Sequence, residues 1–191
     1  MEKFSVRIGL ITEMLGTVCK DPKIYQTYIE SKKPEEKTDE AEYLTVEKIE
    51  EKGWTGFHMD DQGLFIYEYM IKGFLKHAGN TFKEQLKIKA LRSKIDDYVF
   101  ISPRKIYLGK KIPDGVIERP LRAMTMQGPR ISLARSDYVN AGLELTFEII
   151  LLDHKEIKPD IIKELLKYGE LSGLGQFRNG GYGRFSILEI K

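Results

Sequence analysis

Cysteine and long apolar runs are the features that this sequence most clearly lacks. Cys19 is its single cysteine, which excludes an internal disulfide and a cysteine-rich zinc site. No stretch approaches the roughly 18 consecutive apolar residues that a membrane-spanning helix needs. The opening residues MEKFSVRIGL contain no apolar signal-peptide core. We therefore expect a cytoplasmic protein without a membrane partner.

Carboxylates arranged to hold a metal are also scarce. The adjacent pairs Asp60-Asp61 and Asp96-Asp97 would point to opposite sides of an extended backbone, and DDQG has the composition of a turn. Catalysis by two metal ions needs carboxylates that converge on one point. We therefore predict no metal and no cofactor.

Histidine, the side chain best suited to proton transfer at neutral pH, occurs three times, as His58, His77 and His154. His77 follows Lys76 on a basic segment, and Lys72 lies about one helical turn earlier. His77 is therefore the candidate catalytic residue. The alternative is that each histidine is an ordinary surface or half-buried residue.

Positive charge is concentrated in one part of the chain, although the net charge is only +2. Residues 72–135 hold fifteen basic and five acidic side chains, whereas residues 30–52 are net negative. If the basic side chains share a surface, this pattern predicts binding to a polyanion. The candidate phosphate contacts in this segment are Lys72, Lys76, Arg119, Arg122, Arg130 and Arg135. Salt bridges from the arginines to Asp114, Glu118 or Glu144 are the alternative.

Hydrophobic periodicity predicts strands at both ends of the chain, over residues 4–12 and 184–190. Residues 131–135 lead through SDYVNAG into the strictly alternating run 143–152, which we interpret as a long hairpin. Pro159 then begins a helix that Gly169 ends.

The region at about 20–95 is predicted to be an insertion of helices and a hairpin. Its predicted helices begin after Asp21-Pro22 and span residues 39–52 and 74–86, and Gly79-Asn80 interrupts the last of them. The two predicted hairpin strands span residues 55–59 and 64–71. Without the insertion, the order β-α-β-β-α-β remains. That order is typical of the ferredoxin-like or RRM-like unit, so we predict a single α+β domain over residues 1–191.

The stretch LSGLGQFRNGGYGRF, near the end of the sequence, is unusually rich in glycine. Its predicted binding residues are Gly173, Gly175, Arg178, Gly180, Gly181, Gly183 and Arg184. Closely spaced glycines can aim several backbone N–H groups at one anion, and guanidinium groups match phosphate oxygens. A Walker A loop and a dinucleotide-binding loop are both excluded, because those loops precede a helix and this one precedes a strand.

The pattern Gly-x-Gly-x-x-Arg-x-Gly-Gly-x-Gly-Arg before a final strand resembles the glycine-rich loop of the RAMP superfamily, the repeat-associated proteins of CRISPR systems. The resemblance implies a ferredoxin-like core with this loop between the second helix and the fourth strand. It also implies RNA, single-stranded or stem-loop, as the partner, with CRISPR-Cas or other host proteins as further partners. Candidate base-stacking residues are Tyr98, Phe100, Tyr107 and Tyr182.

Three functions remain open at this point. The leading hypothesis is an RNA-binding protein without catalytic activity, encoded by a phage or mobile element, because the first half resembles uncharacterised phage and prophage proteins of Gram-positive bacteria. The second is a protein-interaction module that mimics or inhibits a CRISPR-Cas subunit. The third is a metal-independent endoribonuclease of the RAMP type. The histidine expected just after the first strand of such a nuclease is missing from TEMLGTVCKDPK.

Overall fold

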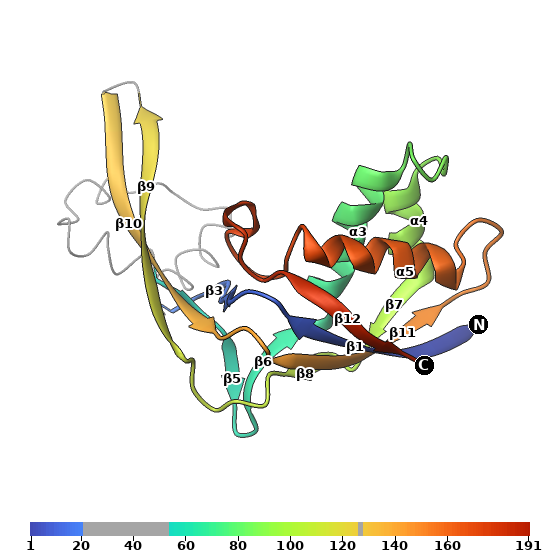
Figure 1. The fold of residues 1–191 in the computed structure, drawn as a ribbon, viewed down its shortest axis with the longest axis horizontal. Helices are drawn as coiled ribbons and strands as arrows, with labels where there is room; N and C mark the ends of the chain where they lie inside the picture. Colours follow the sequence, from blue (N-terminus) through green and yellow to red (C-terminus); the bar gives the residue numbers. More distant parts are fainter. Residues whose placement is uncertain (21–53, 126–127) are drawn as a thin grey trace, which may run out of the picture.

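The computed structural model describes residues 1–20, 54–125 and 128–191 and has an α+β architecture (Figure 1). The helices predicted after Asp21-Pro22 and over 39–52 lie outside the described residues. A four-stranded antiparallel sheet, in the order β12-β1-β11-β7, forms the centre of the molecule.

The central sheet joins the two ends of the described chain. Its strands are β1 (Glu2–Leu10), β7 (Val99–Ser102), β11 (Glu144–Leu151) and β12 (Phe185–Ile190). Burial alternates along β11, which explains the strict apolar alternation of its sequence. The strands predicted at the two ends of the chain are confirmed, and β12 pairs with β1 in antiparallel register.

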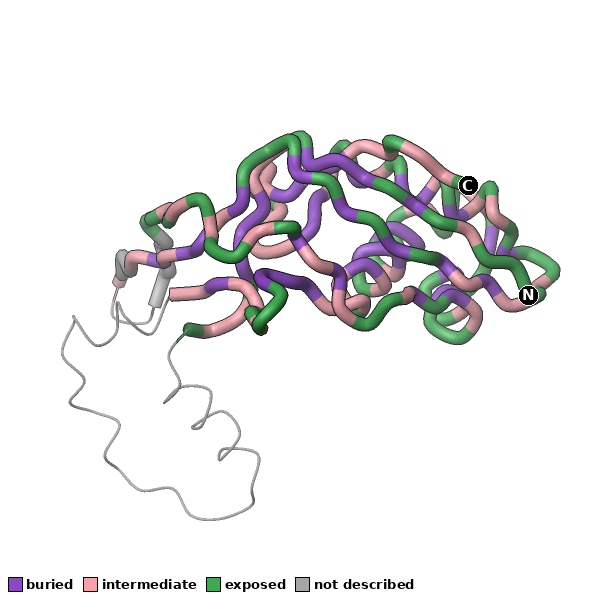
Figure 2. Tube along the Cα trace, turned by 90° about the horizontal axis from the view of Figure 1, so that it is seen from below, coloured by how far each residue is buried: buried purple, intermediate pink, exposed green. Residues whose placement is uncertain are grey.

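Three helices lie together on one side of this sheet (Figure 1). They are α3 (Glu68–Phe82), α4 (Leu91–Tyr98) and α5 (Pro159–Lys167). Figure 2 shows buried residues running along the strands and through these helices. The helix predicted from Pro159 is therefore confirmed, with a proline at its start where the missing N–H costs nothing.

Helix α3 differs from its prediction in where it begins and in its continuity. The second strand of the hairpin, predicted over 64–71, ends at Tyr67, and α3 begins at Glu68. The predicted interruption at Gly79-Asn80 is also wrong, because α3 continues through both residues. A Cβ at Gly79 would lie 2.4 Å from Cδ1 of Ile95, so this glycine allows α3 and α4 to pack closely.

Helices α3 and α4 belong to the core, although they fall within the predicted insertion at about 20–95. Phe74 of α3 and Leu91 of α4 share one buried cluster with Val6 of β1 and Phe147 of β11. The apolar faces of both helices pack on the sheet, so these helices form part of the hydrophobic core and not a separate insertion.

The sheet face turned away from the helices carries many charges. Arg7 on this face lies 3.2 Å from a carboxylate oxygen of Glu144 and 3.7 Å from one of Glu189. Glu148 is exposed four residues further along β11 than Glu144. Glu189 is also paired with Lys191 at 2.7 Å, so most of the charges on this face are compensated within the protein.

A long two-stranded hairpin, β9 (Gly115–Thr125) with β10 (Gly128–Val139), projects away from the core (Figure 1). This corrects the predicted hairpin of 131–135 with 143–152, since β10 pairs with β9 whereas β11 pairs with β1 and β7. The part of the hairpin nearest the core, which we call the hairpin root, contains Arg119 on β9 and the residues 135–139 on β10.

Short strands attach to the hairpin root. They are β2 (Met14–Leu15), β3 (Val18–Cys19) and β4 (Thr55–Gly56), in the order β2-β10-β4-β3. Residues 14–19, which follow β1, are thereby brought against the hairpin root.

A third, three-stranded sheet contains β5 (His58–Asp60), β6 (Gly63–Tyr67) and β8 (Lys105–Tyr107). The hairpin predicted around DDQG is confirmed here, and β8 pairs with its second strand. Within the described ranges, no helix is both long enough and apolar enough to cross a membrane.

Candidate nucleic-acid interface

The glycine-rich loop, residues 171–184, connects α5 to β12. A short 3-10 turn, Tyr168–Glu170, precedes it, and a second, Arg178–Gly180, lies within it. The loop contacts β2 through Leu15, β4 through Thr55 and the hairpin root through Ser136; Figure 1 shows it above the start of β12.

The sequence predicted that backbone amides of the loop are free to bind a phosphate group. This prediction is wrong for the amides that already donate hydrogen bonds within the protein. The Gly183 amide donates to the carbonyl oxygen of Glu13 at 2.7 Å, and the Gln176 amide donates to that of Leu15 at 3.2 Å. Others donate within the loop, as the Leu174 amide does to the Gly183 carbonyl at 2.8 Å. The chain that follows β1 occupies these donors, so they stabilise the fold.

The buried glycines let backbone segments touch each other. Gly183 has a φ of 72°, and a Cβ there would lie 1.9 Å from the carbonyl oxygen of Leu174. A Cβ at Gly173 would lie 2.2 Å from the carbonyl carbon of Gly183. These glycines are therefore required by the packing of the loop upon itself.

The loop's two arginines are both half-buried. The guanidinium group of Arg184 lies over Gly181, whose ideal Cβ would be 3.6 Å from Nη2, and its buried Nε has no hydrogen-bond partner among the described residues. The Arg184 amide donates to Oγ1 of Thr12 at 3.0 Å. Phosphate binding by Arg178 and Arg184 stays a prediction.

Arg119 connects the hairpin root to the loop. Its guanidinium carbon lies 4.5 Å from the ring centroid of Phe177, and Nη2 donates to Oγ of Ser136 at 2.7 Å. The residue is only 8% exposed, and burial lowers the pKa of Arg119 from its usual value. A desolvated cation over an aromatic ring is a favourable contact of about 2 kcal/mol.

Two hydroxyl groups extend this contact beneath the loop. Thr55 of β4 and Ser136 of β10 lie 2.8 Å apart, and both donate to Oε1 of Gln176, at 2.7 and 2.9 Å. Strands far apart in the sequence thus hold the loop in a single position.

Asp137 organises the other side of the hairpin root. Its side chain is 1% exposed, and its carboxylate accepts a hydrogen bond from Nε1 of Trp54 at 2.8 Å. Nζ of Lys20 lies 2.6 Å from the other oxygen and 4.5 Å from the Trp54 ring centroid. This buried ion pair joins β10 to the segments on either side of residues 21–53.

The four predicted arginines of residues 119–135 do not share one face. Their register on the hairpin places the positions of Arg119 and Arg130 on one face, and those of Arg122 and Arg135 on the other. Nε of Arg135 lies 2.7 Å from Oε1 of Glu118, so for this arginine the salt-bridge alternative is the arrangement observed.

His77 lies in a cavity of about 310 Å³ that is also lined by Gly73, Lys76, Asn80 and Arg92. Burial, and then the positive charge of Arg178, lower the pKa of His77 from its usual value. The structure therefore brings the predicted catalytic candidate within electrostatic reach of the glycine-rich loop.

The predicted lysine contacts beside His77 are largely neutralised. Lys76 lies 2.6 Å and Lys72 3.5 Å from carboxylate oxygens of Asp96. The hydrogen bond from Lys76 is the main cause that lowers the pKa of Asp96 below its usual value.

Of the four predicted stacking residues, the structure brings only Tyr182 to the loop, where its ring centroid lies 5.9 Å from that of Phe177. Tyr98 packs on His154, and Phe100 lies under Lys72. Tyr107 donates to the Asp60 carboxylate at 3.0 Å.

That Tyr107 contact belongs to a separate cluster on the three-stranded sheet. Asp60 also accepts a hydrogen bond from Lys105 at 2.6 Å, and this is the first cause that lowers the pKa of Asp60. Burial and the Asp60 carboxylate raise the pKa of Tyr107. The ring of His58 packs between Phe65 and Tyr67.

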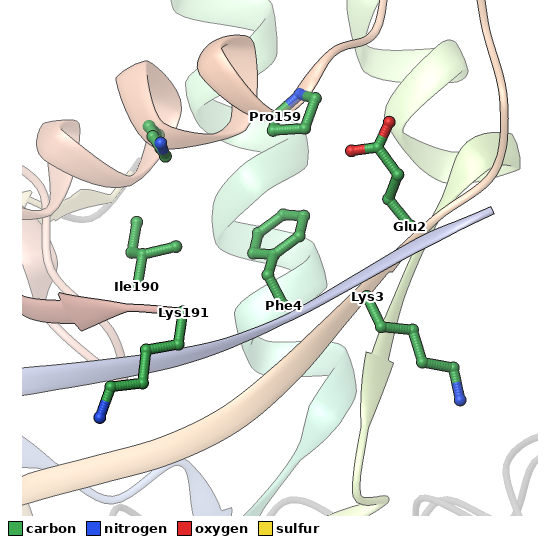
Figure 3. A pocket seen from close by; sticks show the side chains of 7 residues that line it. Glu2, Lys3, Phe4, Pro159, Ile190 and Lys191 are labelled. Atoms are coloured by element: carbon green, nitrogen blue, oxygen red, sulfur yellow. The ribbon is translucent and has the colours of Figure 1, made fainter.

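A further cavity, of about 360 Å³, lies between β1, the end of β12 and α5 (Figure 3). The ring of Phe4 points toward Pro159 inside it, and Lys3, Lys163 and Lys191 are at its border. None of the predicted binding residues lines it.

Sequence reasoning missed Phe177, Gln176, Thr55, Ser136 and Asp137. Phe177 and Gln176 stand among the predicted loop residues, and an aromatic residue beside an arginine was the available signal. Thr55 and Ser136 have no local sequence signal, because only the pairing of β4 with β10 brings them to the loop. Asp137 has none either, because its partners Trp54 and Lys20 are far from it in the sequence.

No family model and no curated protein matches the sequence. Among solved structures, the chain matches one in the cryo-EM structure of the Type III-B Cmr-beta bound to cognate target RNA, with a TM-score of 0.52 and 14% identity. The folds are similar. The match covers 99% of this chain but only 59% of the other, so this chain spans well under two thirds of that protein.

Proposed function

We propose that this protein binds RNA without cleaving it, through a surface formed by the glycine-rich loop and the hairpin root. The observation that carries the proposal is the stacking of Arg119 on Phe177, because it joins a guanidinium group of the hairpin root to an exposed aromatic ring of the loop. The fold neighbour comes from an assembly bound to RNA, which supports the same reading.

We infer a ferredoxin-like, RAMP-type core from the sheet order. Within the sheet the strands have the order β12-β1-β11-β7. Along the chain, α3 and α4 lie between β1 and β7, and α5 lies between β11 and β12, as in the ferredoxin-like unit. On the open face of this sheet, Arg7 is paired with Glu144 and Glu189, and Lys191 with Glu189, so these cations are already engaged within the protein. The loop and the hairpin root are therefore the better candidates. The mobile-element origin and CRISPR-Cas protein partners are part of the same proposal and stay predictions.

We expect Arg178→Ala to weaken RNA binding about ten-fold, since a hydrogen bond to a charged group is worth about 1.5 kcal/mol or more. The loss should be similar for all RNA sequences, because a phosphate contact reads no base. The slope of log affinity against log salt should fall by about 0.7 for the lost contact with a single strand. Fluorescence anisotropy with a labelled short RNA, repeated over a series of KCl concentrations, measures both quantities.

Lys163→Ala is the matched control, because Lys163 borders the cavity of Figure 3 and is half exposed. It should bind RNA as the unmodified protein does. Binding that does not depend on salt, or no binding by the unmodified protein, would contradict the proposal.

A metal-independent endoribonuclease is the second candidate function, favoured by the cavity around His77. Its lowered pKa leaves the imidazole neutral at pH 7, ready to accept a proton from a 2′-hydroxyl group. If the protein cleaves RNA, the rate should rise with pH through this lowered pKa and then level off.

In that case His77→Ala should lower the cleavage rate by about 10²–10⁴-fold, measured with labelled stem-loop RNA in EDTA. His58→Ala is the control, because His58 lies between two aromatic rings of another sheet. Equal rates for His77→Ala and the unmodified protein, or no cleavage at all, would exclude this candidate.

A further inference from the structure

Phe177 has a backbone conformation that a bulky side chain rarely adopts. Its φ is 55° and its ψ is 40°, in the left-handed region that glycine usually occupies. For a residue with a Cβ this conformation costs about 1–2 kcal/mol. Such strain persists only where surrounding contacts impose it, and it is common at ligand-binding sites.

The surroundings of Phe177 impose this geometry. A Cβ at Gly180 would lie 2.3 Å from Cε1 of the Phe177 ring, so only glycine leaves room for the ring there. The guanidinium group of Arg119 contacts the ring, and Tyr182 lies beside it. The ring is thus held firmly at one place on the surface.

Despite these contacts, Phe177 stays 43% exposed and is absent from the hydrophobic core. Full burial of a phenylalanine would stabilise the fold by about 1.5–3 kcal/mol, part of which is given up here. The loop therefore combines backbone strain with an incompletely buried ring, and the contact of that ring with Arg119 leaves much of its surface in solvent.

An exposed, immobilised aromatic ring beside an arginine is the arrangement that binds unpaired nucleobases. Every base has a π face that can stack on such a ring, whereas bases inside a duplex already stack on their neighbours. Arg119 on the ring adds positive charge under the stacking site, and Arg178 follows Phe177 directly in the sequence.

We propose that Phe177 stacks on one unpaired RNA base, so that the interface selects single-stranded RNA over duplex RNA. This inference rests on the proposed RNA-binding function. It decides between the two forms of RNA, single-stranded or stem-loop, that the sequence leaves open.

The test compares Phe177→Leu with the unmodified protein on oligoadenosine and on a fully paired duplex of the same length. Stacking on an aromatic side chain is worth about 1–3 kcal/mol per base, so affinity for the single strand should fall about 5- to 150-fold. Affinity for the duplex and the salt slope should stay unchanged, because no phosphate contact is lost. Phe177→Trp should restore binding to the single strand.

A fold defect is separated from a binding defect by Phe177→Gly, in which the strain is relieved. This variant should unfold at a temperature no lower than that of Phe177→Leu and should still lose single-strand affinity. If Phe177→Leu binds oligoadenosine as the unmodified protein does while Arg178→Ala binds weakly, the stacking role is wrong and RNA binding stands. If the unmodified protein binds neither RNA, the proposed function itself fails.

Discussion

Gly183→Ala should lower the free energy of unfolding by about 3 kcal/mol. The φ of 72° would place alanine in the left-handed region, at a cost of about 1–2 kcal/mol. The new Cβ would also lie 1.9 Å from the Leu174 carbonyl oxygen, and overpacking of this kind costs about 1–3 kcal/mol. That oxygen belongs to the backbone and cannot rotate away, so the loop itself must shift. Urea unfolding followed by circular dichroism measures the loss.

Gly73→Ala is the control, because Gly73 is exposed within α3 and a Cβ there would meet nothing within 4 Å. It should raise stability by about 0.5–1 kcal/mol through the better helix propensity of alanine. Equal stability of Gly183→Ala and the unmodified protein would show that the loop does not pack upon itself as described.

Asp137→Ala should cost about 3 kcal/mol and loosen the hairpin root. The substitution leaves Nε1 of Trp54 without its acceptor and Nζ of Lys20 without its counter-ion. Breaking a buried ion pair costs about 3–5 kcal/mol, and the lower value applies because the Lys20 side chain is 44% exposed and can reach water. Urea unfolding again gives the free energy.

Trp54 provides a direct readout, since it is the only tryptophan in the sequence. Asp137→Ala should shift its emission to longer wavelength as the indole becomes hydrated, while Asp137→Asn, which keeps an acceptor, should shift it less. Asp153→Ala is the control, because that carboxylate is 85% exposed and should change stability by less than about 0.5 kcal/mol. An unchanged Trp54 spectrum in Asp137→Ala would contradict the described hydrogen bond.

Much of the architecture could be predicted because it depends on local patterns. The alternation along 143–152 predicted β11, Pro159 predicted the start of α5, and the DDQG turn predicted the hairpin of β5 and β6. Helix α3 was harder to predict, because Gly79 was interpreted as a helix interruption when its purpose is contact with Ile95. A sequence shows that a glycine is present but not which neighbour requires it.

The candidate site was predicted only in part, for the same reason. The glycine-rich loop and its arginines stand out in the sequence, whereas the acceptors that close its amides, the carbonyl groups of Glu13 and Leu15, carry no sequence signal at all. Likewise, charge counts cannot distinguish Arg119, buried against Phe177, from Arg135, paired with Glu118.

By itself, the sequence determined which segments form strands and helices, where positive charge accumulates and that a glycine-rich loop precedes the last strand, because these follow from side-chain type and spacing along the chain. Only the tertiary structure decided that the loop's backbone faces inward, that its exposed chemistry comes from Phe177 and neighbouring guanidinium groups, and that β4, β10 and the loop meet. Those outcomes depend on contacts between residues far apart in the sequence, such as Thr55 with Gln176, 121 positions apart, which no local pattern encodes.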